Sequence, residues 1–129
     1  GYRWAAGQRS KAPGAYREAI RLLSVIVGRD PQDGESRGRL ALYLAKSGEE
    51  KPALEELDRL NALKNPGPGG SFKKALTYEV LAQRDSALRA LGDAIRAGYS
   101  LREIESEPEL ASLRSDVRFH QLLAAAPQR

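Results

Sequence analysis

Several residue types are absent or scarce in this chain of 129 residues. It has no cysteine and no methionine, and it has a single histidine, His120. Without cysteine there can be no disulfide, no thiolate nucleophile and no thiolate metal site, and nothing points to an oxidising compartment, so a cytoplasmic location is the default expectation. No acid or nucleophile is placed with His120 by sequence spacing, so we predict a structural role for it and no catalytic residues.

Long hydrophobic runs are also missing. The most apolar stretch, residues 20–27, is interrupted by Ser24 and is far shorter than the roughly 20 residues of a membrane-spanning helix. The net charge is only +4, and the basic residues are spread along the chain with few aromatic residues between them. We therefore expect neither membrane insertion nor nucleic-acid binding. The length fits one domain, and because the chain begins at Gly1 and lacks methionine we expect it to be part of a longer protein.

A 34-residue period runs through most of the chain. Ala19, Ala53 and Ala87 are equally spaced at this interval, and an aliphatic residue follows each of them. The other positions that recur with this period are Leu23, Leu57 and Leu91; Ile26, Leu60 and Ala94; the small residues Gly14, Gly48 and Ala82; and the small residues Gly7, Ala41 and Ala75. One helix face is therefore predicted three times in register, over units 1–33, 34–67 and 68–98.

Each unit is predicted to hold two helices joined by a turn. In unit one the turn is expected at Pro13–Gly14, in unit two at Ser47–Gly48 with a left-handed C-cap, and Gly98 is expected to end the last helix of unit three. Asp85 is the expected N-cap of that last helix. The predicted helices cover approximately residues 15–27, 36–46, 52–60, 71–82 and 85–97.

The joint between units two and three contains the run Asn-Pro-Gly-Pro-Gly-Gly-Ser over residues 65–71. Proline and glycine disfavour helix, so we predict a non-helical segment and a looser joint than elsewhere, which could be a hinge or a rigid turn. Its glycines precede Lys73 and Lys74, but the phosphate-loop pattern is absent and two prolines remove backbone donors. We therefore predict an inter-repeat turn and no cofactor site.

The tail, residues 99–129, is predicted to be a helical cap. Short helices are expected over 101–106, 108–113 and 115–124. The apolar residues that would seal the end of the stack are Leu110, Leu113, Val117, Phe119, Leu122 and Leu123. Alternating glutamates from Glu103 to Glu109 have no glycine among them, unlike a calcium loop, so we predict a solvated acidic face and no metal site.

The period and these residues resemble the tetratricopeptide repeat (TPR) family over roughly residues 1–98. Ser10 and Lys74 depart from the family pattern. The matching residues are Gly7, Gly14, Ala19, Leu23 and Pro31; then Ala41, Leu44, Gly48, Ala53, Leu57 and Pro66; then Ala75, Tyr78, Ala82, Ala87, Leu91 and Ala94. The resemblance implies an all-α, right-handed α-solenoid of three helix-turn-helix repeats, followed here by the helical cap.

The resemblance further implies a non-catalytic protein–protein interaction module, a scaffold whose concave groove binds a peptide or partner protein. The residues that would line the groove are Trp4, Gln8, Lys11, Arg39, Leu42, Lys46, Lys73 and Leu76, with Phe72 pointing inward or buried. Their mixed basic and apolar character suits an acidic or a C-terminal peptide.

An alternative comes from residues 107–119, which resemble the closing segment of bacterial multidomain proteins such as Ser/Thr kinases and adenylate cyclase relatives. The chain would then be an intramolecular regulatory or spacer segment of a larger enzyme, packed through an N-terminal face around Tyr2 and Trp4. A homo-oligomer through the same face is also considered, because removal of an upstream element would leave apolar surface uncovered.

Overall fold

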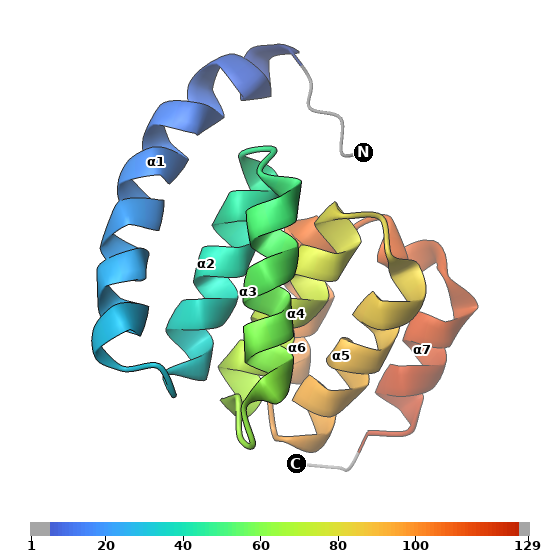
Figure 1. Ribbon diagram of the computed structural model, residues 1–129. Helices are drawn as coiled ribbons and strands as arrows, with labels where there is room; N and C mark the ends of the chain where they lie inside the picture. Colours follow the sequence, from blue (N-terminus) through green and yellow to red (C-terminus); the bar gives the residue numbers. More distant parts are fainter. Residues whose placement is uncertain (1–5, 127–129) are drawn as a thin grey trace.

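The computed structural model describes the backbone of residues 6–126 and the side chains of residues 14–126. Within this part the chain is all-α and contains no strand, as predicted. The elements are α1 (Ala6–Arg29), α2 (Gly34–Lys46), α3 (Glu50–Ala62), α4 (Gly67–Val80), α5 (Arg84–Arg96), α6 (Leu101–Ser106), the 3-10 turns η1 (Pro108–Leu110) and η2 (Leu113–Ser115), and α7 (Val117–Ala124) (Figure 1). In the described residues, no helix combines the length and the apolar character that crossing a membrane requires.

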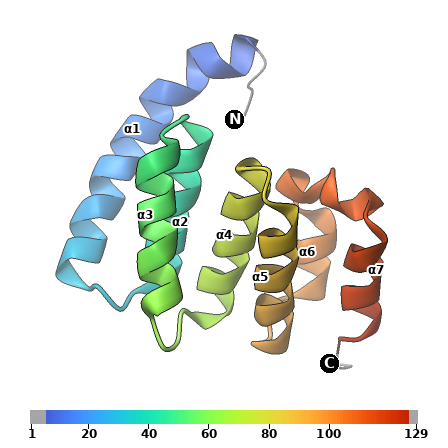
Figure 2. The ribbon, with the colours of Figure 1, turned by 45° about the vertical axis from the view of Figure 1, so that its right-hand side comes forward.

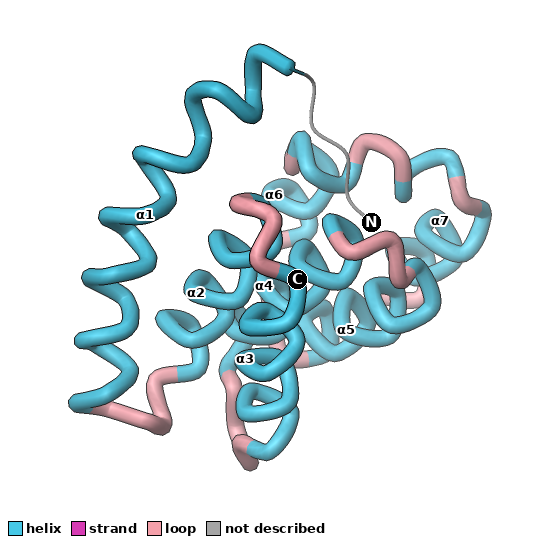
Figure 3. The backbone as a smooth tube through the Cα atoms, turned by 45° about the horizontal axis from the view of Figure 1, so that its top comes forward, coloured by secondary structure: helices cyan, strands magenta, loops and turns pink. Residues whose placement is uncertain are grey.

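Two helical hairpins form the centre of the molecule. Helices α2 and α3 make one hairpin and α4 and α5 the other, and α2 also packs directly on α4. Helix α1 packs on the outer side of α2, while η1 packs on α4 and α7 on α5. Figure 2 shows these helices following one another across the molecule from α1 to α7, and Figure 3 shows the short loops that join them.

The turns inside both hairpins are Schellman motifs. The predicted left-handed cap at Gly48 is confirmed, with a φ of 87°, and Glu49 N–H donates to the Leu44 carbonyl at 2.8 Å. Ala82 occupies the equivalent position of the next unit and adopts the same conformation, with a φ of 61°, although it carries a Cβ. Gly98, with a φ of 103°, ends α5 in the same way, as predicted.

Unit one does not contain the predicted turn. Helix α1 runs without interruption from Ala6 to Arg29, so the predicted break at Pro13–Gly14 is wrong (Figure 1). The reversals at Gly48 and Ala82 are held by packing of the following helix on the preceding one. Helix α1 instead packs on α2 through its second half, with Leu23 and Val27 in the core. A proline removes one helix hydrogen bond, and here the helix continues through Pro13 without reversing the chain.

The Pro/Gly segment is also different from the prediction. Helix α4 begins at Gly67, so most of residues 65–71 are helical, and the joint that we expected to be loose is a close helix–helix contact. A Cβ at Gly38 would lie 2.8 Å from the Lys73 Cβ, and one at Gly70 would lie 3.0 Å from the Gly34 carbonyl oxygen. The glycines are therefore required for α2 and α4 to approach each other, and this packing offsets their cost as helix residues.

The C-terminal segment forms a cap with two departures from prediction. Helix α6 has the predicted bounds, but residues 108–113 form the separate turns η1 and η2 where one helix was expected. Leu110, Leu113 and Phe119 are buried in the core, whereas Val117 is exposed, so its predicted place in the apolar face is wrong. Val117 is the first residue of α7, directly after the N-cap Asp116, and it is 65% exposed. Similarly, Gln83 and not Asp85 is the N-cap of α5.

Candidate functional site

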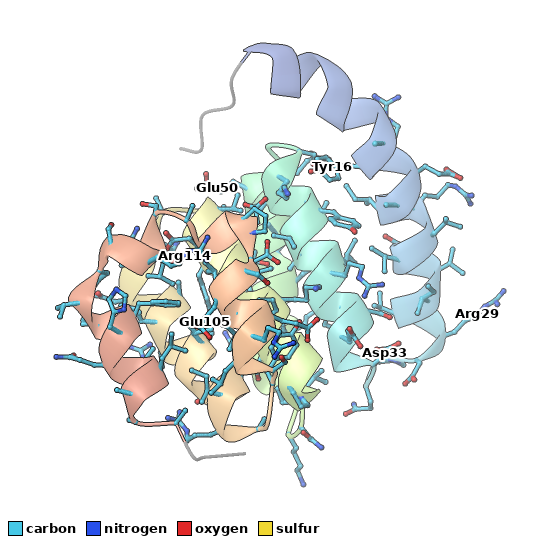
Figure 4. All side chains as sticks on the ribbon, turned by 180° about the vertical axis from the view of Figure 1, so that it is seen from behind. Tyr16, Arg29, Asp33, Glu50, Glu105 and Arg114 are labelled. Atoms are coloured by element: carbon cyan, nitrogen blue, oxygen red, sulfur yellow. The ribbon has the colours of Figure 1, made fainter. Side chains whose placement is uncertain are left out.

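Helix α2 is buried along most of its circumference, because α1, α3 and α4 all pack on it. The side chains of Glu35, Arg39, Tyr43 and Lys46 remain at least partly accessible. Steps of four, four and three residues place them in one line along the helix. We call this line the α2 strip, and Figure 4 shows α2 lying between α1 on one side and the C-terminal segment on the other.

Aromatic side chains from α1 and α2 lie together at the C-terminal half of the α2 strip. The rings of Tyr16 and Tyr43 have centroids 5.3 Å apart and are tilted by 37°. The Lys46 Nζ lies 5.8 Å from the centroid of the Tyr16 ring, within the range of a cation–π contact. This end of the strip therefore combines amphipathic rings with a positive charge, a combination typical of protein-binding surfaces.

The C-terminal segment reaches the other side of the strip. Lys46 forms an ion pair with Glu109 of η1. Burial lowers the pKa of the Lys46 ammonium, but the bond to Glu109 and the neighbouring Tyr16 outweigh this, and the net shift is upward. Lys46 therefore stays protonated, and much of its charge is already neutralised by Glu109.

A second aromatic pair lies beside the strip, between α4 and the start of α6. The rings of Phe72 and Tyr99 stack with centroids 4.1 Å apart and an angle of 16°. Lys73 Nζ lies 5.6 Å from the Phe72 ring centroid. The pKa of the Tyr99 hydroxyl is raised by burial and by the carboxylates of Glu103, Glu107 and Glu35. The surroundings of Tyr99 are thus acidic, so the charge around the strip is mixed and not uniformly basic.

Arg39 and Lys73 occupy equivalent positions of successive units, on the adjacent helices α2 and α4. They are close in space because Gly38 lies directly against the Lys73 side chain. Among the described residues Arg39 has one weak ion pair, with Glu35 at 3.5 Å, in which the Arg39 and Glu35 side chains are 41% and 59% exposed. A surface pair of this kind contributes little to stability, so the Arg39 guanidinium can exchange this partner for another carboxylate at small cost.

The structure divides the predicted groove residues into three groups. Arg39 and Lys46 lie on the strip and Lys73 lies beside it. Leu42 and Leu76 are buried in the core, together with Phe72, and therefore support the surface from behind. Trp4 lies outside the described residues; Gln8 and Lys11 belong to α1, and their side chains lie outside the described part.

Four residues of this surface were missed by the sequence prediction: Tyr16, Tyr43, Tyr99 and Glu109. Tyr43 could have been found, because it is four residues from Arg39 and three from Lys46 on a helix whose other positions are mostly apolar. Tyr99 and Glu109 belong to another part of the chain, and no local spacing in the sequence predicts that they lie near the strip.

Two further polar side chains of the described residues make local contacts with the backbone. His120 Nε2 lies 2.8 Å from the Arg114 carbonyl oxygen, which can only accept, so this nitrogen carries the proton and donates. Glu107 accepts from the Glu109 N–H at 3.0 Å and so caps η1. Among the described residues no group of three or more His, Asp or Glu side chains is placed to hold a metal ion.

Comparison of the chain with protein-family models, with curated proteins and with solved structures finds no match. The TPR resemblance consequently rests on the 34-residue pattern and on the helical hairpins.

Proposed function

We propose that the chain is a non-catalytic protein-interaction module, a short right-handed solenoid of TPR-like repeats whose α2 strip binds a peptide or an extended segment of a partner protein. Two features support the solenoid: the hairpins α2/α3 and α4/α5 repeat with the 34-residue period, and their Schellman turns fall at the equivalent residues Gly48 and Ala82. In such a stack the first helices of successive units lie side by side, as α2 and α4 do.

The observation that carries the proposal is the pair Arg39 and Lys73. One accessible basic side chain stands at the same position of two successive units, so a peptide crossing the units meets a positive charge in each. Tyr43 lies one turn further along the strip and offers an aromatic surface with a polar tip. An acidic segment that also carries an apolar side chain fits this arrangement.

Lys46 has a different part in this proposal. Because Glu109 of the C-terminal segment already neutralises it, the acidic groups of a partner are bound by Arg39 and Lys73. The buried Leu42 and Leu76 hold α2 and α4 in place beneath these side chains and do not touch the partner. The proposed binding surface therefore consists of the α2 strip and Lys73, and it excludes Leu42 and Leu76 of the predicted groove.

The test compares two double charge reversals in affinity capture from cell extract, followed by titration calorimetry with the identified partner. Arg39→Glu with Lys73→Glu removes the proposed contacts. Lys51→Glu with Lys64→Glu changes the net charge by the same amount at exposed positions on α3 and in the loop that follows it. A partner bound by the wild type and the control, and lost from the first variant, supports the proposal.

A partner bound equally by all three proteins contradicts the proposed site, provided that the circular dichroism and melting temperature of the variants match those of the wild type.

A second candidate is an intramolecular role, in which the chain packs against a neighbouring domain of a larger bacterial enzyme. The observation in its favour is an exposed apolar face on α1, made by Leu22, Val25 and Ile26. In that case reversal of Arg39 and Lys73 has no effect on binding, whereas Ile26→Glu in the longer chain separates the two domains and increases protease cleavage between them.

A further inference from the structure

The part of helix α1 whose side chains are described, residues 14–29, has two apolar faces, and the described residues cover one of them. Leu23 and Val27 are buried against α2. Leu22, Val25 and Ile26 are 49%, 44% and 42% exposed. At about 100° per residue, the exposed residues lie within about 60° of Leu22, whereas the buried face is centred about 120° from it. A second helix can therefore approach the exposed face without meeting α2.

The 34-residue register shows what kind of element covers this face elsewhere. The positions equivalent to Leu22 and Ile26 are Glu56 and Leu60 in α3, and both are buried. Glu56 bonds to Arg37 of α2 at 2.7 Å, so this face of α3 points toward the preceding helix of its hairpin. Ala90 and Ala94 of α5 are likewise buried, and α5 packs on α4. The Leu22 and Ile26 positions of α1 thus correspond to the face by which α3 and α5 pack on an antiparallel helix. The Val25 position corresponds to Arg59 and Asp93, whose side chains are accessible to solvent.

Charges on α1 indicate which helix fits there. Glu18, Leu22, Val25 and Arg29 follow one another in steps of four, three and four residues, which is the seam of a helix pair. When two copies of α1 lie antiparallel with Leu22 opposite Val25, Glu18 of each copy lies opposite Arg29 of the other. A parallel pair would place like charges together. Glu18 already pairs with Arg21 at 2.8 Å, which lowers the pKa of its carboxyl. Both side chains are more than 60% exposed, so Glu18 can exchange this partner at small cost.

We propose that the face formed by Leu22, Val25 and Ile26 binds the same face of a second copy of the chain, so that α1 pairs antiparallel with α1 in a two-fold symmetric dimer. The interface is self-complementary, as two-fold symmetry requires. Each α1 then stands against its partner as α3 stands against α2. This inference concerns α1 alone and does not depend on the proposed peptide site.

The first test is sedimentation equilibrium over a wide range of protein concentration. The wild type is expected to show a reversible monomer–dimer equilibrium. Ile26→Glu should raise the dimer dissociation constant by at least about tenfold, because it replaces an apolar side chain of the interface in both copies with a carboxylate that must lose its hydration. Val117→Glu is the matched control, since Val117 is 65% exposed on α7 at the other end of the molecule, and it should leave the constant within about twofold of the wild type.

The second test uses charge reversal to establish the orientation. Glu18→Arg alone and Arg29→Glu alone should each weaken the dimer, because each creates two like-charge pairs across the interface. The two changes in one chain should restore it, since every pair is again opposite in sign. A dimer formed elsewhere would show neither the loss nor the rescue.

Two outcomes overturn the proposal. One is a dimer that persists in Ile26→Glu, which places the interface on another face. The other is a wild type that stays monomeric at every concentration. In a monomer, a fall in melting temperature that is caused by Ile26→Glu and not by Val117→Glu would show that residues of the same chain cover this face.

Discussion

Helices α1 and α3 have the same pattern in the 34-residue repeat but different surroundings. Three residues of α3 are at most 1% exposed because α2 packs on that helix: Ala53, Leu57 and Leu60. Of their equivalents in α1, Leu23 is buried, Ala19 is half-buried and Ile26 is exposed. One helix pattern therefore gives different burial according to the neighbours that the described residues supply.

The sharpest way to test this comparison is to truncate equivalent residues in the two helices. Leu60→Ala should lower the free energy of unfolding by about 3 kcal/mol, because it opens a cavity in the core. Ile26→Ala should lower it by less than about 1 kcal/mol, because much of that side chain is already in water. Urea denaturation at low protein concentration measures both, and equal losses would show that the face of α1 is covered within the monomer.

Glycines in α2 and α1 also differ in their surroundings, so an added Cβ should have opposite effects on stability in the two helices. Gly34→Ala should destabilise the protein by about 2 kcal/mol, because the new Cβ would overlap the carbonyl oxygen of Pro66 where α2 meets α4. Gly28→Ala in α1 should stabilise it by about 0.5 kcal/mol, since nothing lies within 4 Å of that Cβ and alanine favours helix. Thermal melting followed by circular dichroism measures both changes. A tolerated alanine at Gly34 would mean that the α2–α4 joint is loose after all.

Helices α2 and α4 differ at several equivalent buried positions, and one of these pairs is Leu40 in α2 and Lys74 in α4. Both are buried, and Lys74 Nζ donates to Asn61 Oδ1 at 2.9 Å. Burial lowers the pKa of the Lys74 ammonium, so protonation opposes folding at neutral pH. Lys74→Leu, which repeats the residue of α2, should raise the stability by about 1 kcal/mol at neutral pH.

The same variant should change the pH dependence of unfolding. In the wild type the unfolded chain binds the Lys74 proton more tightly than the folded chain, so stability rises as the pH increases from the lowered pKa to the ordinary lysine value. In Lys74→Leu this rise should disappear. Urea denaturation at neutral and alkaline pH measures this rise in the free energy of unfolding. If the rise is unchanged in Lys74→Leu, a group other than Lys74 causes it.

The three equivalent turn positions give the smallest effects and differ in sign. Gly48→Ala should cost about 1 kcal/mol, because the φ of 87° is unfavourable for alanine, and Ala82→Gly should gain up to about 1 kcal/mol by relieving the same conformation. Gly14→Ala should stabilise α1 slightly, because Gly14 continues a helix. Differential scanning calorimetry resolves these changes. A destabilising Gly14→Ala would indicate a left-handed turn at Gly14 in solution.

Local patterns determined most of the secondary structure. The all-α class, the two hairpins of units two and three, the cap at Gly48 and the bounds of α6 follow from apolar periodicity and from turn residues. Each depends on interactions within one or two turns of helix, which neighbouring residues control. The sequence predicted only part of the candidate site. It identified Arg39, Lys46 and Lys73 but not the tyrosines or Glu109.

Tertiary packing decided the remainder. Whether Pro13–Gly14 breaks a helix depends on a partner for the reversed chain, and whether residues 65–71 form a hinge depends on how closely α2 can approach α4. The meeting of Lys46 with Glu109, far along the chain, likewise requires the cap to fold back beside α2. Residue order alone was enough to set where helices form and which of their faces are apolar. The packed molecule settled which of those faces are covered, because burial is a property of pairs of elements and not of one.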